Sequence, residues 1–231
     1  MQAVILAGGL GTRLWPLTKT VPKPMVPVAG VPYLEHQLRL LARQGILDVV
    51  LLTGYLGEQV EEYFGDGRAL GISIQYSREP EPLGTGGALR DARRKLGPAF
   101  LLIYGDSYLP IDYTEALGKL AQSGAEGLMV VYDNRLADTS VKNNVNLDDD
   151  FFVSRYEKDS ADPLSYVEAG VLAFRHEVLE RIPGEGAVSL EKLIFPQLIA
   201  ERRLLGLPTS QRFYDIGTPD RLRAIEAFLD H

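Results

Sequence analysis

The pattern that most constrains the fold is a regular alternation of short apolar runs with amphipathic helical segments in the first half of the chain. The runs Ala3–Ala7, Val49–Thr53, Ile72–Tyr76 and Phe100–Tyr104 are rich in Val, Ile and Leu and too continuous to be half exposed. Such runs are typical of parallel strands that are covered on both faces. The alternation predicts an α/β fold with a doubly wound, mostly parallel, Rossmann-like sheet.

Apolar residues between these runs recur at helical spacing. Leu34, Leu38 and Leu41 share one face, and a second stripe covers residues 56–64. Stripes of this width predict helices that pack against the sheet. We also expect helices over 87–96 and 113–122, and a last helix that Thr218 caps and Pro219 opens.

Residues 134–174 carry the signals of short strands and turns. Asp148-Asp149-Asp150 separates Val145–Leu147 from Phe151–Arg155, which predicts a hairpin with a solvated acidic tip. We therefore expect a single domain over residues 1–231, with one half at about 1–133 and a second half, containing a small β-rich part, at about 134–231.

Composition excludes several function classes. The chain of 231 residues has a formal net charge of −7, which argues against nucleic acid or an anionic membrane as the main partner. It has no cysteine, so thiol nucleophiles and thiolate metal sites are excluded, and its three histidines are scattered in sequence. The lack of cysteine also fits a reducing compartment.

No apolar run approaches the roughly 20 residues that a membrane-spanning helix needs. The segment Met1–Leu6 has no basic region and leads directly into glycines, which indicates a first strand rather than a signal peptide. We expect a cytoplasmic protein without a membrane partner. The sequence leaves open whether identical chains form an oligomer.

The segment Leu6-Ala7-Gly8-Gly9-Leu10-Gly11-Thr12-Arg13-Leu14 follows the first predicted strand. Its glycines allow a tight turn, a close approach of backbone to ligand, and N–H groups that point inward at an anion. A phosphate group is the ligand that such a loop favours. A purely structural glycine-rich turn is the alternative.

Two common nucleotide-binding motifs do not fit this loop. A dinucleotide fingerprint needs glycine or alanine where Leu14 stands, and an acidic residue where Thr53-Gly54 ends the second strand. The Gly-Lys-Ser/Thr ending of a P-loop is missing as well. These departures disfavour a dehydrogenase and a P-loop kinase or ATPase.

Charged residues at three other places fit phosphate chemistry. Lys23 is flanked by Pro22 and Pro24, which stiffen the segment and present one cation at a fixed position, and Arg13 adds a second positive charge. Asp106 follows the fourth strand, at the edge where open α/β sheets bind ligands, and Asp215 precedes a sharp turn. Both carboxylates are candidate Mg²⁺ ligands. A solvated lysine and an aspartate that caps a turn are the alternatives.

Gly105-Asp106-Ser107 also resembles the Gly-Asp-Ser hydrolases, whose serine is the nucleophile. Those enzymes carry the triplet near the N-terminus and Asp-x-x-His near the C-terminus, whereas this chain has it mid-chain and ends in Asp230-His231. The metal-binding Asp-x-Asp of many glycosyltransferases is absent because Tyr108 holds the third place.

Taken together, these motifs resemble the sugar-1-phosphate nucleotidyltransferases, the nucleotide-sugar pyrophosphorylases. The resemblance covers nearly the whole chain and rests on the glycine-rich loop with Pro22-Lys23-Pro24, then Pro82–Gly87, Gly105-Asp106 and Asp215–Pro219 in the family's order. It implies transfer of a nucleotidyl group from a nucleoside triphosphate to a sugar 1-phosphate, with pyrophosphate released.

The resemblance also implies roles for particular residues. The nucleotide would be bound by Leu6, Ala7, Gly8, Gly9, Gly11, Thr12, Arg13, Gly84 and Thr85. Arg13, Lys23 and Asp106 would be catalytic, and Asp106 and Asp215 would hold Mg²⁺. The sugar phosphate would be bound by Asn144, Glu157, Lys158, Glu168 and Gly170. Under the same resemblance the first half binds the nucleotide and the second half binds the sugar.

Departures from the family pattern bear on specificity. Pro82 stands where related uridylyltransferases often have glutamine, and Asn143-Asn144 replaces the Tyr-Gly of many relatives. The spacing is most similar to heptose-1-phosphate and mannose-1-phosphate guanylyltransferases, which indicates GTP. A uridylyl- or thymidylyltransferase, and a non-catalytic nucleotide-sugar sensor, are the alternatives.

Overall fold

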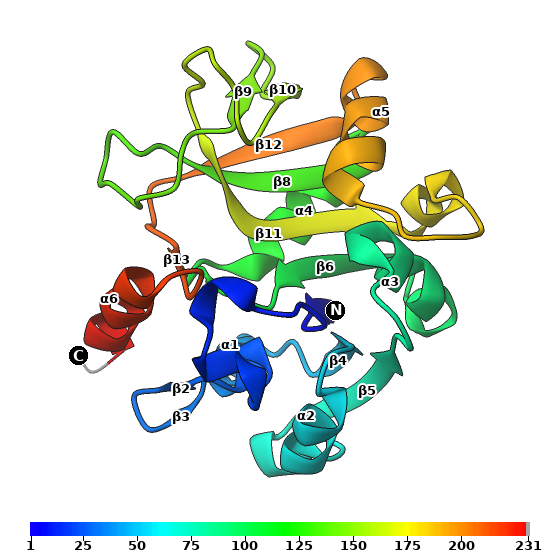
Figure 1. Ribbon diagram of the computed structural model, residues 1–231. Helices are drawn as coiled ribbons and strands as arrows, with labels where there is room; N and C mark the ends of the chain where they lie inside the picture. Colours follow the sequence, from blue (N-terminus) through cyan, green and yellow to red (C-terminus); the bar gives the residue numbers. More distant parts are fainter. Residues whose placement is uncertain (230–231) are drawn as a thin grey trace.

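The computed structural model describes residues 1–229; Asp230 and His231 lie outside the described residues. A seven-stranded sheet with the order β12-β8-β11-β6-β1-β4-β5 runs through the centre of the molecule (Figure 1). Its strands are β1 (Gln2–Leu6), β4 (Asp48–Thr53), β5 (Ser73–Arg78), β6 (Ala99–Tyr104), β8 (Gly127–Tyr132), β11 (Val167–Arg175) and β12 (Leu204–Thr209).

The sheet is mostly parallel. β1 pairs in parallel with β4 and β6, and β4 with β5, while β11 runs antiparallel between β6 and β8. β12 is parallel to β8. The predicted α/β fold with a doubly wound sheet is confirmed.

Helices cover both faces of this sheet. They are α1 (Tyr33–Arg43), α2 (Gly57–Phe64), α3 (Gly84–Ala92), α4 (Tyr113–Gln122), α5 (Phe195–Ala200) and α6 (Pro219–Leu229). One buried cluster joins the sheet to α1, α2, α4 and α6, and a second joins its other face to α3 and α5. No helix among residues 1–229 is both long enough and apolar enough to cross a membrane.

Strand β6 shows why the apolar runs are continuous. Leu101 and Ile103 belong to the first cluster, whereas Phe100 and Leu102 belong to the second. Successive side chains of a strand point to opposite faces, so a strand that is covered on both sides must be apolar at every position.

The sheet order places a topological switch point between β1 and β6. The chain moves outward from β1 to β4 and β5, then returns to the other side of β1 as β6. Ligands of open α/β sheets bind outside the carboxyl ends of the strands at such a point. The residues that follow Leu6 and Tyr104 are therefore brought together there.

Smaller ladders complete the fold. They are formed by β2 (Pro27–Val28) with β3 (Val31–Pro32), β7 (Ser107–Tyr108) with β13 (Tyr214–Asp215), and β9 (Val145–Leu147) with β10 (Val153–Tyr156). The last of these is the predicted hairpin. Both β11 and β12 enter the central sheet, so the β-rich part outside the sheet is limited to this hairpin and its loops.

The acidic tip of the hairpin is not simply solvated, as the sequence had led us to expect. Asp148 Oδ1 accepts hydrogen bonds from the backbone N–H groups of Asp150 and Phe152, and Arg202 forms ion pairs with both Asp148 and Asp150. Arg202 follows α5, far along the chain, and no local pattern indicates this contact.

Candidate functional site

The glycine-rich loop after β1 folds back on the Lys23 segment. Gly11 has a φ of 64°, in the left-handed region, and a Cβ there would lie 3.1 Å from the Cβ of Lys23. The Gly11 carbonyl accepts hydrogen bonds from the Leu14 N–H at 2.9 Å and the Thr18 hydroxyl at 2.7 Å. These contacts fix the loop and Lys23 relative to each other.

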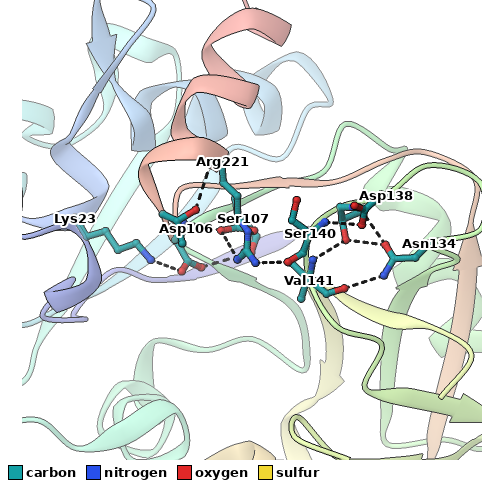
Figure 2. A network of polar contacts seen from close by, with 12 residues as sticks. Lys23, Asp106, Ser107, Asn134, Asp138, Ser140, Val141 and Arg221 are labelled. Atoms are coloured by element: carbon teal, nitrogen blue, oxygen red, sulfur yellow. Dashed lines mark hydrogen bonds and ion pairs between the residues drawn. The ribbon is translucent and has the colours of Figure 1, made fainter. Parts of the chain in front are cut away.

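Lys23 and Asp106 meet across the cleft. Lys23 Nζ donates to Asp106 Oδ2 at 2.5 Å (Figure 2). The lysine side chain is only 11% exposed. Gly105 lets the two strand ends close: its N–H donates to the Leu6 carbonyl at 2.9 Å, and a Cβ at this position would lie 2.4 Å from that oxygen. The glycine-rich loop after β1 and Gly105-Asp106 after β6 are thus in direct contact.

Asp215 lies next to Asp106 because β13 pairs with β7, which places Asp215 opposite Ser107. Burial raises the pKa of Asp215 and the neighbouring Asp106 raises it further, while the Gly217 N–H and Arg221 oppose the rise. Gly217 separates three charged groups: a Cβ there would lie 2.7 Å from Asp215 Oδ1, 3.5 Å from Arg221 Nη1 and 3.6 Å from Arg13 Nη1. Arg13 and Asp215 therefore lie close to each other beside Gly217, which lines the cleft described below.

The donor set of Asp106 and Asp215 fits Mg²⁺. Asp215 is paired with Ser107, the neighbour of Asp106 in the chain, and both carboxylates offer hard oxygen ligands. Among residues 1–229, no group of three or more His, Asp or Glu side chains forms a metal-binding cluster. Mg²⁺ usually needs only one or two protein carboxylates and fills its shell with water and substrate phosphates.

A cleft of about 530 Å³ opens at the switch point. The predicted residues that line it are Leu6, Ala7, Gly8, Gly9, Gly11, Thr12, Arg13, Lys23, Gly84, Thr85, Asp106 and Lys158. The predicted residues that do not line it are Asn144, Glu157, Glu168, Gly170 and Asp215. Glu79, Tyr104 and Glu191 also line the cleft, although the sequence analysis did not select them.

Glu79 directly follows β5 and enters the cleft between two glycines. A Cβ on either Gly8 or Gly54 would lie 2.8 Å from Glu79 Oε1, so a side chain at either position would displace the carboxylate. Its Oε2 accepts a hydrogen bond from the Leu83 N–H at 3.0 Å. Burial raises the pKa of Glu79, the Leu83 N–H opposes the rise, and Asp91 adds to it. The sequence analysis did not select Glu79 because the predicted strand ends at Tyr76, whereas β5 extends to Arg78.

Glu191 anchors the far wall of the cleft. Its Oε2 accepts hydrogen bonds from the hydroxyls of Thr85 at 2.8 Å and Ser189 at 2.7 Å, and its Oε1 lies 3.4 Å from Lys158 Nζ. Burial raises the pKa of Glu191, but Lys158 and the hydroxyl donors outweigh burial and bring it below its usual range. The hydroxyl of Thr85 also accepts from the Leu190 N–H at 2.8 Å, so it supports this wall.

Apart from Lys158, the predicted sugar-side residues do not line the cleft. Asn144 Oδ1 accepts from the Glu168 N–H at 2.9 Å, and the Asn144 carbonyl accepts from the Glu157 N–H at 2.8 Å. Asn144 thus connects the backbone at Glu157 with the backbone at Glu168. The Glu157 side chain turns away to an ion pair with Arg155.

Glu168 is buried, with 8% exposure, and burial raises its pKa. The Tyr156 hydroxyl donates to its Oε2 at 2.7 Å, while its Oε1 has no hydrogen-bond partner among the described residues. Gly170 has a φ of 76°, and a Cβ there would lie 2.3 Å from Ser107 Oγ. The glycine therefore lets β11 approach Ser107.

The fold and this cleft define a class of protein: a doubly wound α/β scaffold with a glycine-rich loop and a cation–carboxylate pair at its switch point. Residues 2–231 match the nucleotidyl transferase family, and the chain belongs to that family. The resemblance to sugar-1-phosphate nucleotidyltransferases is thereby confirmed.

Named relatives and solved structures agree with this assignment. The chain is 37% identical over 224 residues to mannose-1-phosphate guanylyltransferase of Mycobacterium tuberculosis, and the match covers 95% of this chain and 62% of that protein. It is 32% identical over 223 residues to D-glycero-alpha-D-manno-heptose 1-phosphate guanylyltransferase of Campylobacter jejuni, covering 95% and 96% respectively. HddC from Yersinia pseudotuberculosis, solved with GMP-PN, superposes with a TM-score of 0.83 at 26% identity over 99% of both chains.

Proposed function

We propose that this protein transfers a guanylyl group from GTP to a sugar 1-phosphate of the mannose or heptose type and releases pyrophosphate. The observation that carries the proposal is the convergence of the Gly8–Arg13 loop, Lys23 and Asp106 on one cleft, with Asp215 beside them. The named guanylyltransferase relatives support the choice of substrates.

The reaction joins two anions, so their repulsion is the main obstacle. A phosphate oxygen of the sugar 1-phosphate forms a bond to the α-phosphorus, and the bond from that phosphorus to the bridging oxygen of pyrophosphate breaks. The attacking oxygen already carries negative charge at neutral pH, so no general base is needed. The loop N–H groups, Arg13 and Lys23 neutralise charge and fix the two reactants in line.

Asp106 and Asp215 are the residues that would hold Mg²⁺. When bound there, the ion supplies further positive charge to the reacting phosphates. Lys23 contacts Oδ2 of Asp106 in the structure, so the lysine and the ion would share this carboxylate.

Glu79 supports guanine as the base. A carboxylate can accept two hydrogen bonds side by side, and guanine presents two adjacent donors, N1–H and the N2 amino group, on its Watson–Crick edge. Thymine and uracil present a single N–H between two carbonyl acceptors, which a carboxylate would repel. Glu79 lies in the same cleft as the phosphate loop.

For the sugar side, we propose that Lys158 binds the phosphate and that Glu168 accepts hydrogen bonds from sugar hydroxyls. Lys158 lines the cleft and Glu168 has an unpartnered oxygen. Asn144, Glu157 and Gly170 would shape this subsite by holding its backbone segments together. Residues 1–133 would then form the nucleotide half and residues 134–231 the sugar half.

A cytoplasmic location is part of the proposal, because a chain without cysteine suits a reducing compartment.

Pyrophosphate release, measured with Mg²⁺ across GTP, UTP, dTTP, CTP and ATP, tests the proposal. Each triphosphate is paired with mannose, heptose and glucose 1-phosphates. We expect release with GTP and a mannose-type sugar. Release with UTP or dTTP instead would replace the proposed base, and nucleotide binding without release from any pair would favour the sensor.

A further inference from the structure

Arg221 links Asp215 to a loop on the sugar side. It lies in the first turn of α6, and its Nη1 is 3.3 Å from Asp215 Oδ1. Its Nη2 donates to the carbonyl of Ser140 at 2.5 Å. Figure 2 shows the resulting network, which runs from Lys23 and Asp106 past Arg221 to Ser140 and Asn134.

The position of Arg221 is unfavourable for the helix itself. The N-terminus of a helix carries partial positive charge, so a cation in its first turn is destabilising. The Asp220 carboxylate does not compensate Arg221, because it pairs with Arg223. The Arg221 side chain is 22% exposed, against 70% for that of Arg223. The contacts of Arg221 with Asp215 and with the Ser140 carbonyl offset this unfavourable position.

The loop over residues 133–144, which connects β8 to β9, is closed on itself by Asn134. Its Nδ2 donates to the Val141 carbonyl at 2.8 Å and to Asn143 Oδ1 at 2.7 Å. Its Oδ1 accepts from the Thr139 hydroxyl at 2.7 Å. Ser140, at the turn of this loop, has a left-handed φ of 61°. The loop is thus a compact unit, and a contact at Ser140 acts on all of it.

The end of this loop leads into the proposed sugar subsite. Asn143 Nδ2 donates to the Leu164 carbonyl at 2.9 Å, and Asn144 Oδ1 accepts from the Glu168 N–H at 2.9 Å. A shift of the loop would therefore move Asn144 relative to Glu168, which β11 holds in the central sheet.

We infer that Arg221 is a positioning residue that holds Asp215 and the 133–144 loop in one fixed arrangement, so that the sugar subsite is set relative to the reacting phosphates. The guanidinium suits this role because its planar fork presents separate N–H groups to two acceptors, whereas the lysine ammonium is a compact point charge. The kinetic part of the inference rests on the proposed function; the structural part does not.

Amide hydrogen exchange of the ligand-free, metal-free protein tests the structural part. We expect Arg221→Gln to speed exchange over residues 133–144 by about tenfold, the change expected from one lost charged hydrogen bond. The matched control is Arg223→Gln, an exposed arginine on the same helix, which should leave exchange in this loop unchanged. Equal exchange in Arg221→Gln and the wild type would overturn the inference.

Arg221→Lys tests whether the loop needs both contacts of the guanidinium, to Asp215 and to Ser140, or only a positive charge. It keeps a cation near Asp215, and we expect exchange in the loop to stay raised. It also provides the comparison if Arg221→Gln does not fold. Full restoration of wild-type exchange by lysine would refute the role of the guanidinium fork.

Kinetics then test the consequence for the reaction. We expect Arg221→Gln to raise the KM for the sugar 1-phosphate by about tenfold, with the KM for GTP changed by less than about twofold. An equal rise in both constants would contradict the assignment to the sugar side. A wild-type protein without any transfer activity would refute the proposed function, and the exchange experiment would still decide whether Arg221 holds the loop.

Discussion

Replacement of Glu79 by glutamine should shift base selectivity away from GTP. The substitution keeps the size of the side chain and one acceptor, which can still receive the Leu83 N–H. It replaces the other carboxylate oxygen by an amide group that donates. One of the two N–H donors of guanine would then face the amide donor and lose its hydrogen bond. Uracil and thymine would present an N–H to the amide oxygen and a carbonyl to the amide N–H, so both would be matched.

The magnitude follows from the loss of one hydrogen bond to a charged acceptor in a partly buried position. Such a bond contributes about 1.5–3 kcal/mol, and each 1.4 kcal/mol corresponds to about a tenfold change. We therefore expect kcat/KM for GTP to fall by roughly 10- to 100-fold, while kcat/KM for UTP and dTTP stays level or rises.

The assay is pyrophosphate release at fixed saturating sugar 1-phosphate, with each triphosphate varied. Glu81→Gln is the matched control, because Glu81 is an exposed acidic residue two positions further along that does not line the cleft. A GTP-to-UTP selectivity in Glu79→Gln within about threefold of the wild-type ratio would refute the assignment of Glu79 to the base, since even a single neutral hydrogen bond contributes about that much.

Three further outcomes follow from the structure. Lys23→Ala should lower kcat by about 100- to 1,000-fold with circular dichroism unchanged; near wild-type turnover would remove Lys23 from the reaction. The folded pKa of Asp215 lies above its unfolded value of about 3.9, so stability is lost as pH rises from that value through the folded pKa. Asp215→Asn should therefore raise the Tm of the metal-free protein at neutral pH while transfer activity falls, and a lower Tm would contradict this reasoning. Gly105→Ala, whose Cβ would lie 2.4 Å from the Leu6 carbonyl oxygen, should destabilise the protein in urea by about 2–3 kcal/mol, whereas Gly97→Ala, with no neighbour nearer than 3.7 Å, should lack this steric cost.

Local pattern was sufficient to predict the layers of the fold. The helix expected over residues 113–122 has those bounds, because Asp112 caps it through the Thr114 N–H at 2.8 Å, a signal that lies within a few residues. The buried strands were equally visible as continuous apolar runs. Both features depend on side chains that are neighbours in the sequence.

Features that depend on distant parts of the chain were missed or displaced. Helix α3 was expected to begin at Gly87 but begins at Gly84, because the N–H groups of Gly86 and Gly87 donate to the carbonyl of Val188. The carboxylate of Glu191 enters the cleft through contacts with Thr85 and Lys158, which no spacing reveals. Glu79 was missed because the apolar run that predicted its strand ends at Tyr76, whereas pairing with β4 extends β5 to Arg78.

The position of β11 limits how the molecule can move. Its backbone is bonded to β6 on one side and β8 on the other, so the halves before and after residue 133 share one continuous ladder. Swinging them apart as two lobes would leave buried N–H and C=O groups unpaired, at about 1–3 kcal/mol each. Under the proposed function, reactants would enter and pyrophosphate would leave through short segments at the rim of the cleft, without separation of the two halves.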